Sequence, residues 1–551
     1  IGHGINNYLK LPEILYLKTR GHFINNKKII LEMNFEEILK IESERNEIIF
    51  KNKKNIKLDL KKNFNFYKAT LIKDGKKIPI KIRLKGHRHI HWQDRSKSSY
   101  RIKIKGDERF NGLKTFSLQK PRARNYIYEW IYHQVNSTQN DSINLKYEFF
   151  DLIINGENYG LYALEETPSK LLLERNQKRD GPIFSLYEEI LSENNDPMDR
   201  TFKVLNESFW LNNKNSELTI LAYTKLTDTF LGKRALNETF DLKILAWYVA
   251  TVQLLGTHHG LYLKSPKYYY NPLTGLFEII PYDGHYINQQ LVHNAALNIT
   301  KTDLGNFLFE KLHEDEKFLK EYHHALIKIS SIKFLDNFFD KNKDKIKYIN
   351  SLIYADYFLN DFLFYYGPGL YYFDKSEVYK KAAIIREKIN IDPNKVVVKM
   401  TGNLLEVENY NLINPYLKID KIYCGNNEIN FQQKLILRNI KKVIKEVLPT
   451  MLCSKINVND EFNNKNFQIN FMNLKTIKVD TIDEKKFLKY FKIEDKKILL
   501  KNDSTVIDEN ITIPKDYTVI ILPGQKITLK DNAFIYSLSN FIIGQIDNDK
   551  K

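Results

Sequence analysis

The sequence predicts a mixed α+β protein built from several units, because strand and helix patterns occupy different parts of the chain. Alternating runs dominate from about residue 66 to 165, helical patterns prevail from about 166 to 395, and short β runs return after about 396. The chain has 551 residues, which favours two to four domains. Its hydrophobic content of 43% is ample for folded cores.

The first β-rich stretch opens with a hairpin. In "FYKATLIKDGKKIPIKIRLKG" two alternating runs flank an Asp-Gly pair, which is a common turn signal. The segment "SSYRIKIKG" alternates strictly and predicts another strand, and "NYIYEWIYHQV" predicts an amphipathic helix. The run "YEFFDLIINGENYGLYALEE" then predicts two strands around the turn "NGEN".

The helix-rich stretch is interrupted near 260–285 by a strand pair around "NPLTG". Before it, "FDLKILAWYVATVQLLG" places apolar residues on one helical face, and after it "DKNKDKIK" predicts a solvated helix face or loop. The strand "LFEII" is soon followed by Asp283 and Gly284. This pair fits either an ordinary turn or a metal-binding aspartate at a strand end.

The last 45 residues contain short strands separated by turn residues, with apolar pairs at Ile511/Ile513, Val519/Ile521 and Ile527/Leu529. Such strands bury one face only when they are stacked on neighbours, as in a β-solenoid. We expect further rungs to follow those present.

The chain is strongly basic, with a net charge of +18 from 85 Lys+Arg against 67 Asp+Glu. This balance suits an anionic partner, but the lysines are scattered among Asn and Ile, so a specific nucleic-acid partner is not predicted. Cys424 and Cys453 lie outside any C-x-x-C motif, which indicates neither a disulfide framework nor a zinc site. No apolar run is long enough to span a bilayer. An N-terminal signal or anchor can precede Ile1.

Two charged positions resemble the arrangement that kinases use to hold phosphates, a strand lysine and a helix glutamate. In "SYRIKIK", Arg101, Lys103 and Lys105 share one strand face, and the following helix carries Glu129. The alternative is an ordinary basic strand face and an ordinary helical acid. The histidines of "GHRHIHW" alternate and fit either metal ligands or a polar surface loop.

Several blocks occur in order between about residues 65 and 290, among them "RLKG", "SSYRIKIKG", "YEFFDLIINGENYGLYALEE" and "YYYNPLTGLFEIIPYDG". Together they resemble the CotH family, the spore-coat protein H type of atypical protein kinase. The chain is more closely similar to bacterial members in which a parallel β-helix follows the kinase-like region. The resemblance implies a bilobal kinase-like fold that binds ATP with Mg²⁺ or Mn²⁺. It also implies phosphorylation of a hydroxyl, typically serine, on a secreted or cell-surface protein.

The resemblance assigns roles to particular residues. Lys103 would be the strand lysine that holds the phosphates, and Asp283 the strand-end aspartate that binds the metal and serves catalysis. Glu129 is inferred from the layout to be the partner of Lys103. Arg83, in "RLKG", and Glu165, at the predicted crossover between lobes, are further candidates for nucleotide binding.

One block departs from the family pattern. Many members have an aspartate shortly after the helix and an asparagine several residues later, but "GTHHGLYLKSPKYYY" contains neither. Thr257 or His258 falls where the aspartate is expected, and Ser265 falls near the position of the asparagine. His258 or His259 could act as the base, because imidazole titrates near neutral pH. Otherwise the altered segment indicates a site that no longer catalyses.

Two functions are therefore predicted. The first is an ATP-dependent kinase that acts on a protein or glycan hydroxyl. The second is a catalytically degenerate surface or assembly scaffold that binds an anionic polysaccharide. The predicted boundaries are an N-terminal extension (1–60), a kinase-like domain (61–395, with lobes dividing near 165), a β-rich connecting region (396–504) and the start of a right-handed parallel β-solenoid (505–551).

Overall fold

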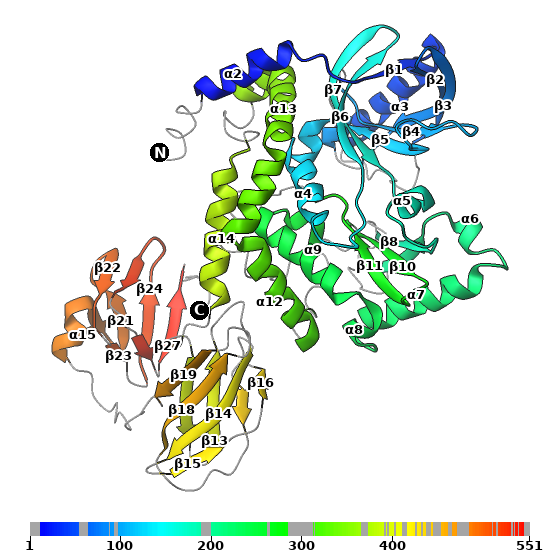
Figure 1. Cartoon of the computed structure of the whole chain (residues 1–551). Coiled ribbons are helices and arrows are strands. Elements are labelled where there is room, and N and C mark those ends of the chain that lie inside the picture. Colours follow the sequence, from blue (N-terminus) through cyan, green and yellow to red (C-terminus); the bar gives the residue numbers. More distant parts are fainter. Residues whose placement is uncertain are drawn as a thin grey trace.

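The structure is a computed structural model that describes residues 11–53, 64–86, 89–92, 97–188, 200–261, 265–284, 315–364 and 373–390, and shorter stretches between 393 and 544. The mixed α+β prediction is confirmed, because helices and several separate sheets are both present (Figure 1).

The first unit is a closed seven-stranded barrel in the order β1-β2-β3-β4-β5-β7-β6. Its strands are β1 (Lys28–Glu32), β2 (Tyr67–Lys73), β3 (Lys76–Leu84), β4 (Tyr100–Ile104), β5 (Thr115–Gln119), β6 (Tyr147–Ile154) and β7 (Glu157–Glu166). The segment predicted as an N-terminal extension therefore contributes β1, which pairs in parallel with β6 and closes the barrel. Alternate residues of the strands point inward and form a single apolar core.

Both predicted hairpins of the barrel are confirmed. Asp74 and Gly75, between β2 and β3, have φ of 50° and 74°, and Asn155 and Gly156, between β6 and β7, have φ of 50° and 85°. Type I′ turns require positive φ at both central residues, and Asp-Gly and Asn-Gly pairs adopt it readily. These two turns therefore set the register of the barrel strands.

The second unit combines helices with the small sheet β11-β10-β8-β9. Its strands are β8 (Ile183–Glu188), β9 (Arg200–Val204), β10 (Lys267–Asn271) and β11 (Leu276–Ile280). Its helices are α4 (Tyr128–Asn136), α5 (Lys170–Arg175), α6 (Glu207–Trp210), α7 (Ser216–Phe230), α8 (Leu236–Thr239), α9 (Leu242–Leu255), α12 (Glu316–Ser330), α13 (Ile332–Phe364) and α14 (Lys375–Ile389), with the short 3-10 turns η2 (Pro121–Arg124) and η4 (His258–Leu261).

The central helix α9 is almost entirely buried, and it shares one core with α4, α12, α13 and α14. It begins at the cap Asp241, whose carboxylate accepts hydrogen bonds from the N–H groups of Lys243 and Ile244. It ends at Gly256, which has the left-handed conformation typical of a C-terminal cap. The next residues form η4, so the packing of α9 determines where the two histidines lie.

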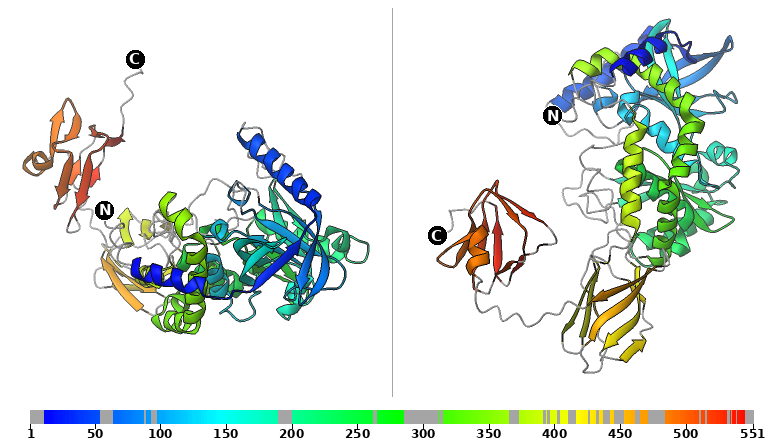
Figure 2. Two further views of the ribbon diagram at one scale, coloured as in Figure 1. Left: turned by 90° about the horizontal axis from the view of Figure 1, so that it is seen from above. Right: turned by 60° about the vertical axis from the view of Figure 1, so that its left-hand side comes forward.

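The chain start packs on the longest helix. The helix α2 (Leu11–His22) lies against α13, as Figures 1 and 2 show. A Cβ at Gly21 would overlap the backbone of Ser351, so only glycine permits this close approach. Arg20 Nη1 donates to Ser351 Oγ at 2.9 Å. The charged stretch from Asp340 to Lys347 lies within α13 and is mostly exposed, as predicted for a solvated helix face.

The chain after α14 forms strands, as predicted. Two antiparallel sheets come first, built from β12 (Val396–Thr401), β13 (Leu404–Asn409), β14 (Tyr416–Cys424), β15 (Asn427–Asn430), β16 (Lys434–Ile436), β17 (Lys442–Ile444), β18 (Cys453–Asp460) and β19 (Lys465–Asn470). Cys424 is buried and disulfide-bonded, contrary to the prediction, and the β14–β18 register sets Cys453 opposite it. Antiparallel pairing brings together two cysteines whose sequence spacing gave no signal.

The last strands, apart from the first of them, pair in parallel. After α15 (Glu484–Tyr490) come β20 (Phe491–Glu494), β21 (Lys497–Leu500), β22 (Ser504–Ile507), β23 (Ile511–Ile513), β24 (Thr518–Ile521), β25 (Lys526–Leu529), β26 (Ile535–Ser537) and β27 (Asn540–Ile543). The strand β20 pairs antiparallel with β21, whereas β24 pairs in parallel with β21 and β27, β22 with β25, and β23 with β26. The parallel pairing therefore begins with β21, whereas the sequence predicted that the solenoid would start at residue 505.

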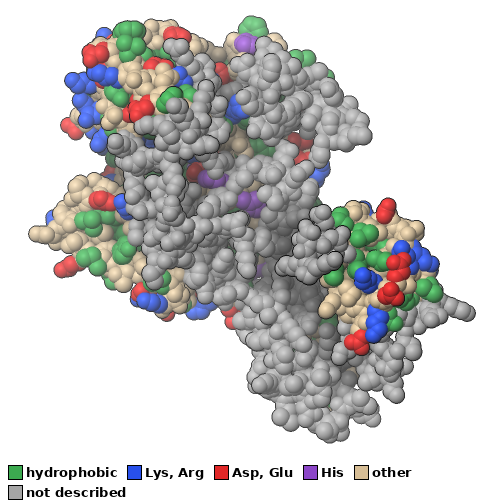
Figure 3. All heavy atoms as spheres, turned by 180° about the vertical axis from the view of Figure 1, so that it is seen from behind, with side chains coloured by type: hydrophobic (Ala, Val, Ile, Leu, Met, Phe, Trp, Pro, Cys, Tyr) green, Lys and Arg blue, Asp and Glu red, His purple; other side chains and the backbone are tan. Residues whose placement is uncertain are grey.

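Charges of both signs lie side by side on the described part of the face in Figure 3, so the basic excess is not gathered there into one basic patch. Among the described residues no helix combines the length and apolar character needed to cross a membrane.

Candidate active site

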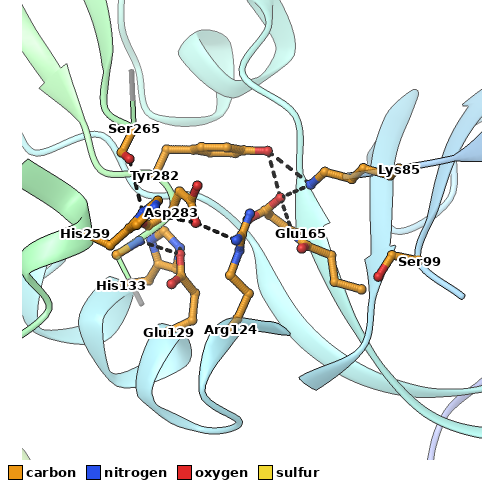
Figure 4. A network of polar contacts seen from close by, with 12 residues as sticks. Lys85, Ser99, Arg124, Glu129, His133, Glu165, His259, Ser265, Tyr282 and Asp283 are labelled. Carbon is orange, nitrogen blue, oxygen red and sulfur yellow. Dashed lines mark hydrogen bonds and ion pairs between the residues drawn. The ribbon is translucent and has the colours of Figure 1, made fainter. Parts of the chain in front are cut away.

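Charged and polar side chains from the barrel and from the helical unit meet at one place, which we call the polar cluster (Figure 4). The barrel supplies residues from the end of β3 and from β7, and the helical unit supplies residues from η2, α4, η4 and the segments that flank β10 and β11. The members of the polar cluster are Lys85, Arg124, Glu129, His133, Glu165, His259, Ser265, Lys267, Tyr282 and Asp283.

Asp283 has an unusual backbone at the end of the strand. Its φ is 58°, in the left-handed region that few residues other than glycine adopt. The next residue, Gly284, packs so closely on Tyr132 that a Cβ would overlap the ring, and its N–H donates to Glu129 Oε1 at 3.1 Å. Such conformations persist where the surroundings enforce them, often at functional sites. The Asp-Gly pair thus aims the Asp283 carboxylate at Arg124 of the polar cluster, and the residues directly after Gly284 lie outside the described part of the chain.

Glu165 is fully buried and accepts three hydrogen bonds at one carboxylate oxygen. The donors to Oε2 are Lys85 Nζ at 2.7 Å, Gln119 Nε2 at 2.5 Å and the Tyr282 hydroxyl at 2.8 Å. Burial alone would raise the pKa of Glu165, but Lys85 and Arg124 outweigh it and bring the pKa to about 2. Glu165 is therefore ionised at neutral pH and fixes the position of Lys85.

Arg124 lies between two carboxylates. Its Nη1 is 2.5 Å from Asp283 Oδ1, and its Nε is 3.7 Å from Glu165 Oε1. Burial would lower the pKa of Arg124, but Asp283 and Glu165 reverse this effect and raise it, so the guanidinium stays charged. Arg124 thus connects the strand end after β11 with β7 of the barrel.

Glu129 lies beneath Asp283 and is fully buried in α4. Besides the Gly284 N–H, its Oε1 faces His133 Nε2 at 3.4 Å, one helical turn further along. Glu129 therefore supports the backbone of the Asp-Gly pair, whereas the sequence predicted that it would pair with Lys103.

The two histidines of η4 have different surroundings. His259 Nδ1 is 2.9 Å from the Asp283 carbonyl oxygen and 3.2 Å from Ser265 Oγ. Because a carbonyl only accepts, the contact with Asp283 requires the proton on Nδ1. Burial, with a smaller effect of the positive charge of Lys381, lowers the pKa of His258 to about 4. The structure thus brings His259 and Ser265 to Asp283, rather than Thr257 or His258.

Two lysines of the polar cluster are partly deprotonated in mildly alkaline solution. Burial lowers the pKa of Lys85 and of Lys267 to about 8, although Glu165 opposes the shift for Lys85 and Asp283 opposes it for Lys267. Lys267 Nζ lies 5.0 Å from the centroid of the Tyr282 ring, which gives it a cation–π contact. Both lysines are mostly charged at neutral pH.

Two predicted residues do not join the polar cluster. Lys103 is exposed on β4 and opposes Lys81 and Thr115 in register. Arg83 is half-buried over the Phe66 ring, with 5.1 Å between its Cζ and the ring centroid. The structure therefore does not bring Lys103 near Glu129, and Lys85 is the barrel lysine that reaches the site.

Register explains this difference. Arg101 opposes Arg83, and the N–H of Lys85 donates to the Ser99 carbonyl, so Lys85 and Lys103 share the outer face of the barrel but at different heights. Lys103 lies four positions beyond Ser99 along the chain, which corresponds to roughly 13 Å at about 3.3 Å per residue. The alternating pattern of β3, extended two residues beyond Arg83, identifies Lys85 as the next side chain on the outer face. No local signal identifies Arg124 or Tyr282.

The donor set is limited for a metal ion. Among the described residues no three His, Cys, Asp or Glu side chains are grouped to hold one. His91 is buried and its Nδ1 lies 3.0 Å from Ser99 Oγ, while His87 and the side chain of His89 lie outside the described residues. Magnesium commonly uses one or two carboxylates together with substrate phosphates and water. Asp283, which is 21% exposed, fits such a single-carboxylate site.

Among the described residues a shallow pocket of about 550 Å³ lies along β8, β9 and the start of α6, and it contains no residue of the polar cluster. We therefore place the candidate site by its chemistry: buried ion pairs, shifted pKa values and a strained aspartate indicate a functional site.

The arrangement defines a charged site between a β-barrel and a helical unit, with lysine–glutamate and arginine–aspartate pairs. Residues 82–389, more than half of the chain, match the family described as CotH kinase protein. The chain therefore belongs to the CotH kinase family. None of the curated proteins compared with the chain matches it.

Proposed function

We propose that this protein is an ATP-dependent kinase that transfers the γ-phosphate to a hydroxyl, with serine or threonine of a protein as the leading acceptor. The single observation that carries the proposal is the strained Asp283, joined through Arg124 to the Lys85–Glu165 pair inside the region matched to the CotH kinase family. In kinases a lysine–glutamate pair and a metal-binding aspartate are the parts that position ATP.

The proposal includes a bilobal kinase-like fold. The barrel, with Lys85 and Glu165, would be the smaller lobe, and the helical unit, with Asp283 and His259, the larger one. The position of the polar cluster between them supports this assignment, since nucleotides bind between the lobes of kinases.

In this proposal Lys85 replaces Lys103 as the residue that binds phosphate oxygens, and Glu165 orients Lys85. Magnesium bound through Asp283 would neutralise the charge on the transferred phosphate. His259 Nε2 would accept the acceptor's hydroxyl proton as the new O–P bond forms and the bond to the leaving ADP breaks. Tyr282 and Lys267 would help to orient the phosphate groups of ATP.

The test is thermal unfolding with and without ATP plus Mg²⁺ or Mn²⁺. A real nucleotide site raises the unfolding temperature through ligand linkage, by about 2.7 kcal/mol of stability at a hundredfold excess over Kd. We expect this rise in the wild type and in Lys103→Gln, and its loss in Lys85→Met and Asp283→Ala. No rise in the wild type at saturating nucleotide would reject the proposal.

A second function is favoured by one observation. A kinase site that binds two metal ions would have a second carboxylate and an amide near the metal-binding aspartate. Here His259 and Ser265 stand beside Asp283 instead. A degenerate kinase fold that acts as a surface or assembly scaffold and binds an anionic polysaccharide would need neither the second carboxylate nor the amide. Autophosphorylation of the wild type that disappears in Asp283→Ala would rule this function out.

The C-terminal part and the disulfide support a secreted or cell-surface location. We propose that β21 to β27 are stacked rungs of a right-handed parallel β-solenoid, a reading supported by their parallel pairing. The disulfide of Cys424 supports an oxidising compartment, because cytosolic thiols are kept reduced. Labelling of intact cells with an impermeant reagent would test the location.

A further inference from the structure

The carboxylate assigned to the metal already contacts a cation of the protein. Arg124 Nη1 lies 2.5 Å from Asp283 Oδ1, and Figure 4 shows the guanidinium reaching from η2 toward both Asp283 and Glu165. The side chain of Arg124 is only 7% exposed. Because little water reaches this ion pair, its attraction is screened less than that of a surface pair.

The polar cluster already holds several cationic side chains without an added ion. Lys85, Arg124 and Lys267 lie among the carboxylates Glu129, Glu165 and Asp283, and Arg101 adds a further positive charge that acts on Lys85 and Lys267. A divalent ion arriving alone would leave this buried region with excess positive charge. Uncompensated charge in a desolvated region is strongly unfavourable.

The backbone fixes Arg124 in place. The two residues that follow it, Asn125 and Tyr126, have φ of 51° and 58°, and the Tyr126 N–H donates to the Pro121 carbonyl at 2.8 Å. Two successive left-handed residues other than glycine cost conformational energy. The turn η2 therefore presents the arginine from a defined position rather than from a loose loop.

We propose that Arg124 is an internal counter-ion that keeps divalent metal off Asp283 until nucleotide phosphates bind. Phosphate oxygens can accept a guanidinium in bidentate fashion, so the phosphates offer Arg124 a new partner and release Asp283. Metal then enters only together with nucleotide. The nucleotide half of this inference rests on the proposed function, whereas the metal half can be measured without nucleotide.

The experiment is Mn²⁺ binding to the full chain without nucleotide, followed by the electron paramagnetic resonance signal of free Mn²⁺. We expect weak binding by the wild type and binding at least about tenfold tighter by Arg124→Gln, a difference of about 1.4 kcal/mol. The gain should vanish in the double variant Arg124→Gln with Asp283→Asn. Equal Mn²⁺ affinity of the wild type and Arg124→Gln would overturn the inference.

Two further variants keep the experiment decisive. Lys178→Gln breaks another buried ion pair, in which Nζ lies 2.7 Å from Glu278 Oε2, and should leave Mn²⁺ binding unchanged. A gain as large as that of Arg124→Gln would count against a specific role for Arg124. If Arg124→Gln does not fold, Arg124→Lys tests the inference instead. Lysine keeps the positive charge but lacks the planar guanidinium whose nitrogens reach two carboxylates at once. We then expect a gain of a few-fold, and no gain refutes the idea.

The outcomes also separate this inference from the proposed function. If ATP binds to no variant, the kinase proposal fails, yet the Mn²⁺ comparison still decides whether Arg124 shields Asp283. If ATP binds and Mn²⁺ affinity is insensitive to Arg124, the kinase proposal stands and the counter-ion role is rejected.

Discussion

Replacing Glu165 by glutamine tests the centre of the polar cluster, because Gln keeps the shape of the side chain and removes its charge. The pKa of Glu165 lies at about 2 instead of its ordinary 4.5. At about 1.4 kcal/mol per pKa unit, this difference corresponds to roughly 3 kcal/mol of stability at neutral pH. The value agrees with the cost of about 3–5 kcal/mol for removing one partner of a buried ion pair.

The sign of the pH dependence follows from the same shift. A carboxyl whose pKa is lower in the folded protein stabilises the fold fully above pH 4.5, and the contribution fades as the pH falls toward 2. We therefore expect Glu165→Gln to lower the unfolding temperature by roughly 5 °C at pH 7, since the unfolding entropy is about 2.1 cal/mol/K per residue over a unit of this size. The gap to the wild type should shrink progressively below about pH 4.5.

The assay is thermal unfolding by circular dichroism at pH 7 and at pH 3. The matched control is Glu377→Gln, which removes an exposed carboxylate 2.8 Å from Lys380 Nζ and should cost less than about 1 kcal/mol. A loss below about 1 kcal/mol for Glu165→Gln at pH 7 would refute the reasoning. So would a gap between wild type and variant that is equally large at pH 3.

Three further predictions concern the strand end, the lysines and the disulfide. Gly284→Ala should lower the unfolding temperature and weaken ATP binding together, since the added Cβ would overlap Tyr132; unchanged calorimetric values for both would contradict the described packing. ATP affinity, measured by titration calorimetry, should fall between pH 7 and 9, because Lys85 and Lys267 lose their charge near pH 8; a flat profile would exclude them as phosphate ligands. Intact mass after alkylation without reductant should show no labelled cysteine, because Cys424 is disulfide-bonded, and labelling would show a reduced chain.

Local sequence signals determined much of the fold. Asp-Gly and Asn-Gly pairs predicted both barrel hairpins, because only a few residue types tolerate positive φ at two adjacent positions. Apolar periodicity predicted the buried helix α9, and apolar pairs predicted the strands at the end of the chain. The ordered blocks also identified the family, which the match over residues 82–389 confirms.

The composition of the polar cluster was decided by tertiary structure. Alternation predicts which face of a strand a side chain occupies, but not which end of that face meets the helical unit. The pattern therefore indicates Lys103, whereas Lys85 is the lysine that reaches the site. Similarly, neighbouring histidines cannot be told apart by spacing, whereas the chain after α9 brings His259 into contact with Asp283 and leaves His258 buried apart from it.

The sequence by itself determined that Asp283 follows shortly after a strand and that its neighbour is glycine. Only the tertiary structure showed that Gly284 packs on Tyr132 and that Arg124 contacts Asp283. The physical reason is distance along the chain: turns and periodicity arise from neighbouring residues, while this ion pair joins groups that packing alone brings together.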